Sequence, residues 1–310
     1  MQNSQVNTSL PLNLSSGIAE GKPGEFWQLG DRAVRRIGFG TKRLAGRDLD
    51  GADRQEHAVA LLRRAVELGV NHLDTAAFYP SHGAAGRTSF DSLDWANDVI
   101  RRALAPYPED LVIATKVGPT RDGLARPDEL PALVERDLRT LGVDTLDLVN
   151  LRLHRVESIA EHFGVLAELQ AKGMIRHLGV SNVRVEHLQE AREIAPVVAV
   201  QNRYSVGFGR VNDEILGVCG ELGIAFVPFF ALTAESREAG GVPESAAVQG
   251  IADRHGATAA QVRLAWTLSR GEHVLAIPGT SSRRHLEENL MAGDITLSPD
   301  DLAALDALVD

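Results

Sequence analysis

An aspartate, a tyrosine and a lysine lie where this sequence could assemble a proton donor. Asp74 follows His72 and Leu73 in an apolar run, Tyr79 comes shortly after it, and Lys116 lies near the end of another apolar run. A tyrosine has an ordinary pKa of about 10 and is a weak acid at neutral pH. A buried ammonium beside it lowers that pKa, and a carboxylate paired with the ammonium holds the ammonium in place. These side-chain types therefore predict a general acid for a developing alkoxide.

Protonation of an alkoxide is one half of a carbonyl reduction. The other half is a hydride, which no side chain supplies, so these residues would need a reduced nicotinamide. Each residue also has a structural interpretation: Asp74 as a turn residue, Tyr79 as a half-buried aromatic, and Lys116 as a lysine that reaches solvent from a strand end. We favour the catalytic interpretation because an acid, a phenol and one of only four lysines in the chain converge at strand ends.

The elements that must position these residues alternate regularly. Short apolar runs of the kind typical of strands buried on both faces are separated by amphipathic segments. Several of these segments, such as Ile159–Lys172, are followed by a glycine that can cap the C-terminus of a helix. We predict strands at Val34–Gly40, His72–Ala76, Leu111–Val117, Leu146–Leu153, Ile175–Val180, Val197–Gln201, Ile224–Phe229 and Val274–Ile277.

This alternation predicts the α/β class and a parallel eight-stranded (β/α)8 TIM barrel. We expect a flexible N-terminal leader at residues 1–25 and a single domain at 26–310, with an extra C-terminal helix at Pro299–Val309. An open Rossmann sheet is the alternative, because Gly38-Phe39-Gly40 begins like a dinucleotide fingerprint. The third glycine and the helix that should follow are missing, so we prefer the barrel, whose strand ends build active sites.

Composition excludes several classes of function. The net charge is −10 and no basic block occurs, which argues against nucleic acid as a partner. The longest apolar stretch, Gly223–Leu232, is too short to span a membrane, and no secretory signal is visible, so we expect a cytoplasmic protein. The single cysteine, Cys219, falls inside a predicted helix and indicates packing, and we predict no metal site. The oligomeric state stays open.

The sequence resembles the aldo-keto reductase superfamily from about Arg36 to Val309. The resemblance rests on motifs that occur in the family's order, most of them at predicted strand ends. They are Gly69–Ala76 with Tyr79, Asn97-Asp98, Ala114-Thr115-Lys116, Gly173–Asn182, Gln201-Asn202 with Tyr204, Ile277-Pro278-Gly279-Thr280, and Glu288-Asn289. The run Asn150-Leu151-Arg152 resembles a bacterial subgroup of the superfamily.

The resemblance implies NADPH, with NADH possible, bound without a Rossmann fold across the C-terminal mouth of the barrel. Tyr79 would be the general acid, tuned by Lys116 and Asp74. Ser181, Asn182 and Gln201 would bind the nicotinamide carboxamide, and Phe229 would stack on the ring. The cofactor residues that we predict are Gly40, Thr41, Asp74, Ser181, Asn182, Gln201, Phe229, Phe230, Leu232, Pro278, Gly279, Thr280, Arg284, His285, Glu288 and Asn289.

Three departures from the family pattern affect the predicted site. Arg152 occupies the position of a family histidine that orients the carbonyl, so we predict it as a fourth catalytic residue, whereas His154 lies two residues on. The loop after strand seven, which in the family usually reads Leu-Gly-Gly, is Leu232-Thr233-Ala234 in this sequence. The family's usual basic residues for the 2′-phosphate correspond to Gly279 and His285, and Arg283 or Arg284 could substitute for them.

The substrate side of the predicted site is less defined. We place Phe78, His82 and His154 along the substrate pocket. The loop 80–94 is either a substrate lid or a neutral insertion. The expected reaction is reduction of a small-molecule aldehyde or ketone. Reduction of a C=N or conjugated C=C bond, and a nicotinamide-binding regulatory subunit, remain as alternatives.

Overall fold

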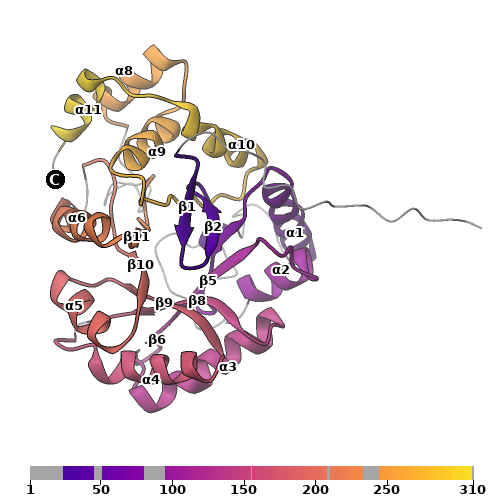
Figure 1. Ribbon diagram of the computed structural model, residues 1–310. Coiled ribbons are helices and arrows are strands. Elements are labelled where there is room, and N and C mark those ends of the chain that lie inside the picture. The colour runs from indigo at the N-terminus through magenta and orange to yellow at the C-terminus, as the bar shows by residue number, and fades with distance from the viewer. Residues whose placement is uncertain are drawn as a thin grey trace, which may run out of the picture.

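The computed structural model describes residues 24–44, 51–79, 95–154, 156–207, 210–232 and 244–308, and its centre is a parallel sheet that curls on itself (Figure 1). Seven strands pair in the order β11-β10-β9-β8-β5-β4-β3. Their bounds are β3 (Phe39–Gly40), β4 (His72–Asp74), β5 (Val112–Val117), β8 (Leu146–Arg152), β9 (Ile175–Ser181), β10 (Val197–Gln201) and β11 (Ala225–Phe226). The predicted parallel α/β sheet is therefore present.

The eighth predicted strand, Val274–Ile277, is not a strand of this sheet. It makes two isolated parallel bridges, Phe226↔Val274 and Ile37↔Ala276, which link it to β11 and to the residues just before β3. The amide of Ala276 donates to Arg36 O at 2.7 Å, and the amide of Leu275 donates to Phe226 O at 2.9 Å. Pro278 ends the run because it has no amide hydrogen to continue a ladder. Among the residues that the structure describes, the sheet therefore has seven strands, one fewer than the eight predicted.

Helices surround the strands, as Figure 1 shows, and they give the sheet its second layer. Gly142 and Gly223, at φ values of 70° and 67°, end two of these helices in the left-handed conformation that glycine adopts without strain. The helices are α1 (Gly51–Glu67), α2 (Trp95–Leu104), α3 (Leu130–Leu141), α4 (Ala160–Ala171), α5 (Val185–Ile194), α6 (Asp213–Leu222), α8 (Ala246–His255), α9 (Ala259–Ser269), α10 (Arg283–Met291) and α11 (Pro299–Asp306). Short 3-10 turns are η1 (Thr41–Arg43), η2 (Pro127–Glu129), η3 (Arg210–Asn212) and η4 (Ala292–Asp294).

Two hairpins were not predicted. β1 (Phe26–Leu29) and β2 (Arg32–Arg35) pair antiparallel, and β2 takes up the beginning of the predicted strand Val34–Gly40. This hairpin lies across the centre of the ring of helices in Figure 1. A second, two-residue pairing joins β6 (Pro119–Thr120) to β7 (Gly123–Leu124) directly after β5.

The inside of the curled sheet changes from apolar to polar along the strands. Leu29 and Val34 of the hairpin pack there against a cluster that contains Ala114, Leu148 and Ala199. Because strand side chains alternate between the two faces, the next inward positions are Lys116, Asn150 and Gln201, towards the carboxyl ends. The polar residues that could do chemistry thus lie above an apolar floor. Within the described residues, no helix is long and apolar enough to cross a membrane.

Candidate active site

Asp74 and Lys116 form a buried ion pair between the neighbouring strands β4 and β5. The Lys116 Nζ lies 2.7 Å from each carboxylate oxygen of Asp74, and it also donates to the backbone oxygen of Thr75 at 3.0 Å. The side chains are only 1% and 3% exposed for Lys116 and Asp74. Three acceptor atoms therefore hold the ammonium in one position, away from water.

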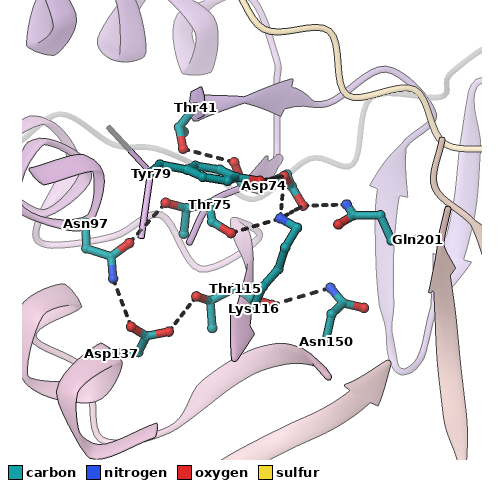
Figure 2. Close-up of polar contacts among 10 residues, drawn as sticks. All are labelled: Thr41, Asp74, Thr75, Tyr79, Asn97, Thr115, Lys116, Asp137, Asn150 and Gln201. Atoms are coloured by element: carbon teal, nitrogen blue, oxygen red, sulfur yellow. Dashed lines mark hydrogen bonds and ion pairs between the residues drawn. The ribbon is translucent and has the colours of Figure 1, made fainter. Parts of the chain in front are cut away.

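Asp74 also accepts hydrogen bonds from two further side chains, so that it connects the predicted catalytic residues (Figure 2). The hydroxyl of Tyr79 donates to Asp74 Oδ1 at 3.2 Å, and Gln201 Nε2 donates to Oδ2 at 2.7 Å. The Lys116 Nζ lies 5.0 Å from the centre of the Tyr79 ring. Residues far apart in the sequence, on β4, β5, β10 and the segment after β4, thus meet at one carboxylate.

The electrostatics of Tyr79 differ from the prediction. Burial and the negative charge of Asp74 raise the pKa of Tyr79 well above its ordinary value, and the phenol's hydrogen bond to Asp74 raises it further. The positive charge of Arg152 opposes this rise in pKa. Asp74 Oδ1 accepts from both the phenol and the ammonium, and the charge of Asp74 raises the pKa of Tyr79 by more than the charge of Arg152 lowers it. Tyr79 is accordingly a protonated phenol at neutral pH, with a proton available to give.

His72 lies in the same strand as Asp74 and is buried. Burial lowers its pKa to about 4, against the opposing charge of Asp74, and the Lys116 ammonium adds to the decrease. The imidazole is therefore neutral inside the folded protein at pH 7.

We expect this histidine to make the protein less stable as the pH falls. Between the unfolded pKa of about 6.5 and the folded value of about 4, only the unfolded chain binds the proton, so the unfolding free energy decreases with decreasing pH. From pH 7 to pH 5 the loss should be about 2 kcal/mol. Urea unfolding of the wild type and His72→Leu at both pH values measures it. An equal pH dependence in the two proteins would contradict the assignment.

Three buried polar atoms at the site have no hydrogen-bond partner among the described residues. They are Ser181 Oγ, Gln201 Oε1 and Asn150 Oδ1. Ser181 and Gln201 are paired in the parallel register of β9 and β10, so both lie at the same level of the sheet. Since a buried polar atom without a partner is costly, unpaired atoms at adjacent strand ends indicate that a ligand with donors and acceptors binds here. The side chain of Asn182, by contrast, donates to Leu153 O at 3.1 Å.

Aromatic rings and cations lie beside these atoms. The guanidinium of Arg152 lies 5.1 Å from the centre of the Phe229 ring, and the rings of Phe229 and Phe230 meet edge to face. Phe230 has a φ of 68°, which is uncommon for a residue with a side chain. Lys42 and Arg203 lie over the Phe230 ring, at 4.5 and 5.1 Å from its centre. The sequence prediction missed both cations, although each directly follows a predicted cofactor residue or motif.

The predicted residues for the adenosine end gather around the start of α10. Arg284 donates to Glu288 Oε1 at 2.8 Å, and its guanidinium lies 3.0 Å from a ring nitrogen of His285. Thr280 Oγ1 accepts from the amide of Ser282 at 3.0 Å. Arg284 and His285 are exposed, whereas Asn289 is buried.

The other predicted cofactor residues make hydrogen bonds or packing contacts with neighbouring residues. The Thr41 hydroxyl donates to the backbone oxygen of Asp74 at 3.0 Å and is buried. Gly40 and Gly279 lie so close that a Cβ on Gly279 would come within 2.5 Å of Gly40 O. Pro278 is buried beside them, and Leu232 packs against a small apolar cluster that includes Ile37.

The residues predicted to line the substrate pocket lie in different environments. Phe78 is buried and packs edge to face against Tyr79, with ring centres 5.6 Å apart. His154 is exposed at the end of the segment that follows β8. His82 and the predicted lid at 80–94 lie outside the described residues, as do Thr233 and Ala234.

Comparisons with known proteins agree with this geometry. The model of the Aldo/keto reductase family matches residues 36–310. A pyridoxine 4-dehydrogenase of Escherichia coli (strain K12) is 41% identical over 295 residues, with 90% of this chain and 96% of the relative covered. An uncharacterized oxidoreductase of Schizosaccharomyces pombe is 35% identical, with coverages of 90% and 88%. A crystal structure of an aldo/keto reductase from Klebsiella pneumoniae with NADP and acetate is 28% identical at a TM-score of 0.76, with 92% of this chain and 95% of that chain covered.

Proposed function

Because the chain belongs to the aldo/keto reductase family and is an oxidoreductase of that type, we propose that it uses NADPH to reduce the carbonyl group of an aldehyde or ketone. The observation that carries this proposal is the convergence of Tyr79, Lys116 and Gln201 on the buried carboxylate of Asp74. A binding module has no need of a phenol held beside a buried ion pair, whereas a reductase needs a proton donor of this kind.

The residues present fit a nicotinamide cofactor. Ser181 Oγ and Gln201 Oε1 are buried atoms without partners among the described residues, and a carboxamide offers the donors and acceptors that they lack. The half-buried ring of Phe229 provides an apolar surface for an aromatic ring. Lys42 and Arg203, together with Arg284, supply positive charge for phosphate groups. Structural relatives from Klebsiella pneumoniae were crystallised with NADP and with NADPH, which supports the choice of cofactor.

When bound, the nicotinamide supplies the hydride, and the chain's own residues handle the proton. The phenol of Tyr79 is protonated at neutral pH and would donate its hydrogen bond to the substrate oxygen in place of Asp74. As charge develops on that oxygen, Tyr79 gives up its proton. The Lys116 ammonium and the Arg152 guanidinium then stabilise the phenolate that remains.

The same groups indicate which carbonyl compounds to test first. Phe78, Phe229 and Arg152 would present aromatic surface and a positive charge to the substrate. One relative carries the name pyridoxine 4-dehydrogenase, and oxidation of an alcohol and reduction of the matching aldehyde are one reaction run in opposite directions. We therefore propose an aromatic aldehyde as the substrate class, with pyridoxal as the first compound.

The test is substrate-dependent oxidation of NADPH, followed at 340 nm, with product analysis. A panel of pyridoxal, benzaldehydes, aliphatic aldehydes, ketones, imines and enones is assayed with NADPH and NADH in parallel. Turnover of pyridoxal with formation of pyridoxine supports the proposal. Turnover of imines or enones alone assigns a different bond, and cofactor binding without any turnover assigns a regulatory role.

We expect Arg152→Ala to raise KM and to lower kcat, each by about tenfold, because the guanidinium over Phe229 contributes both to binding and to the pKa of Tyr79. The matched variant is His154→Ala, at an exposed position two residues on, which we expect to retain kcat within about twofold. Steady-state kinetics on the best substrate of the panel measure both. If His154→Ala were inactive and Arg152→Ala were not, the roles would be reversed.

A further inference from the structure

The strands that carry Asp74 and Lys116 also carry polar residues on their opposite face. Thr75 follows Asp74, and Thr115 precedes Lys116, so their side chains point away from the ion pair towards the helices. That layer, between sheet and helices, is apolar in most proteins of this architecture. Here it contains Thr75 and Thr115 together with Asn97 of α2 and Asp137 of α3, and all four are completely buried.

These four side chains form one connected network (Figure 2). Thr75 Oγ1 donates to Asn97 Oδ1 at 3.0 Å, and Asn97 Nδ2 donates to Asp137 Oδ1 at 3.3 Å. Thr115 Oγ1 donates to Asp137 Oδ2 at 2.6 Å, which is the short distance typical of a bond to a charged acceptor. The network thus links both catalytic strands to both helices behind them.

Asp137 is the costly member of this network. It occupies the position in α3 where the buried stripe Leu130, Val134 and Leu141 would otherwise continue with an apolar residue. A completely buried carboxylate reduces stability unless its interactions compensate for the loss of solvation. A cation lies close by, since Lys116 is adjacent to the Thr115 that bonds to Asp137.

We propose that Asp137 is a positioning residue, which acts through Thr115, Asn97 and Thr75 to fix β4 and β5 and supplies a second negative charge to the Lys116 ammonium. Asp74 neutralises Lys116 in the resting site. Once Tyr79 has released its proton and Arg152 faces the phenolate, the charge on Asp137 keeps the ammonium protonated from behind the strand.

The electrostatics of Lys116 are consistent with this role. Burial lowers the pKa of Lys116, and the charge of Arg152 lowers it further, whereas Asp74 and Asp137 raise it. Tyr79 of the segment after β4 and His72 of β4 also face this lysine, and both are neutral at pH 7 because their pKa values are raised and lowered, respectively. Removal of the charge on Asp137 should therefore lower the pKa of Lys116.

The low number of lysines allows this pKa to be measured without any assay of activity. The chain has only Lys22, Lys42, Lys116 and Lys172, so replacing the other three with arginine leaves Lys116 alone. With 13C-labelled lysine, NMR follows the Cε signal of Lys116 from pH 6 to pH 11. We expect Asp137→Asn, which retains the size and an acceptor for Thr115, to lower the titration midpoint by about one pH unit or more.

The matched control is Asp147→Asn. Asp147 is a partly buried carboxylate next to the same strand, but it accepts from the amide of Ile113 at 3.0 Å, near the other end of β5. We expect Asp147→Asn to lower the thermal unfolding midpoint but to leave the titration midpoint of Lys116 unchanged. Circular dichroism melts of both variants show whether each one folds. If Asp137→Asn does not fold, Asp137→Leu, which removes the same charge and continues the apolar stripe of α3, is titrated in its place with the same expectation.

A kinetic measurement extends the test and rests on the proposed function. Lys116 must be charged for activity, so kcat decreases at the pH where Lys116 loses its proton. In Asp137→Asn this decrease should occur at lower pH, by the same amount as the Lys116 titration midpoint moves. The KM for NADPH should stay within about twofold of the wild-type value. Equal titration midpoints in wild type and variant, or no titration in either up to pH 11, would overturn the role of Asp137. A wild type without turnover would overturn the proposed function only.

Discussion

Replacement of Tyr79 with phenylalanine should lower kcat for carbonyl reduction by about 10²–10⁴-fold, the usual contribution of a positioned general acid. The ring would still pack against Phe78, and Asp74 would still hold Lys116 through both carboxylate oxygens, so the fold and the ion pair should persist. Dissociation constants for NADPH should change by no more than about threefold, because the phenol is bonded to Asp74.

The chain contains a matched control for this substitution. Tyr107 is one of three tyrosines, and its hydroxyl donates to Leu141 O at 2.6 Å, in contact with α3. Tyr107→Phe removes the same hydroxyl group from a half-buried position away from Asp74, and we expect kcat to be unchanged. Single-turnover and steady-state rates with NADPH compare the two variants with the wild type. A Tyr79→Phe protein with more than about a tenth of the wild-type kcat would show that another group donates the proton.

Replacement of Lys116 with methionine should affect stability and activity together. Loss of the ammonium leaves the Asp74 carboxylate buried and without its cation, and breaking a buried pair in this way costs about 3–5 kcal/mol. We expect urea unfolding at pH 7 to show a loss of this size, and kcat to fall by at least about a hundredfold because the phenolate of Tyr79 loses a neighbouring charge.

The double variant Lys116→Met with Asp74→Asn separates the two effects. Because this double variant has no buried carboxylate at position 74, it should regain most of the lost unfolding free energy but none of the lost kcat. Lys172→Met, at an exposed site, removes a lysine without disturbing a buried pair and should change the unfolding free energy by less than about 0.5 kcal/mol. If Lys116→Met and the wild type had the same urea midpoint of unfolding, the ion pair would not contribute to stability as we describe.

Much of the fold follows from local sequence patterns. The predicted strand at Val197–Gln201 has the observed bounds of β10, and α6 ends at the predicted glycine, Gly223. These features depend on hydrophobic periodicity and on the backbone freedom of glycine, which neighbouring residues determine. The same periodicity places Asp74 and Lys116 at the carboxyl ends of neighbouring strands, and the fold brings such ends together.

Other features depend on the assembled structure. Whether Val274–Ile277 forms a full strand depends on its pairing with β11 and with residues near Ile37, and both partners are distant in sequence. The hairpin of β1 and β2 likewise gains its stability from packing against the inside of the sheet. These partners cannot be predicted from the pattern of neighbouring residues in the sequence.

The electrostatics of the site show this division most clearly. The sequence by itself determined that an aspartate, a tyrosine and a lysine lie at strand ends, because strand alternation and strand order depend on local patterns. Only the tertiary structure decided that Tyr79 is buried and that its phenol and the Lys116 ammonium meet at the carboxylate of Asp74, so that the pKa of Tyr79 is raised. It also revealed Asp137 behind Lys116. A pKa sums burial and charges over all neighbours in space, and that sum is defined only once the chain has folded.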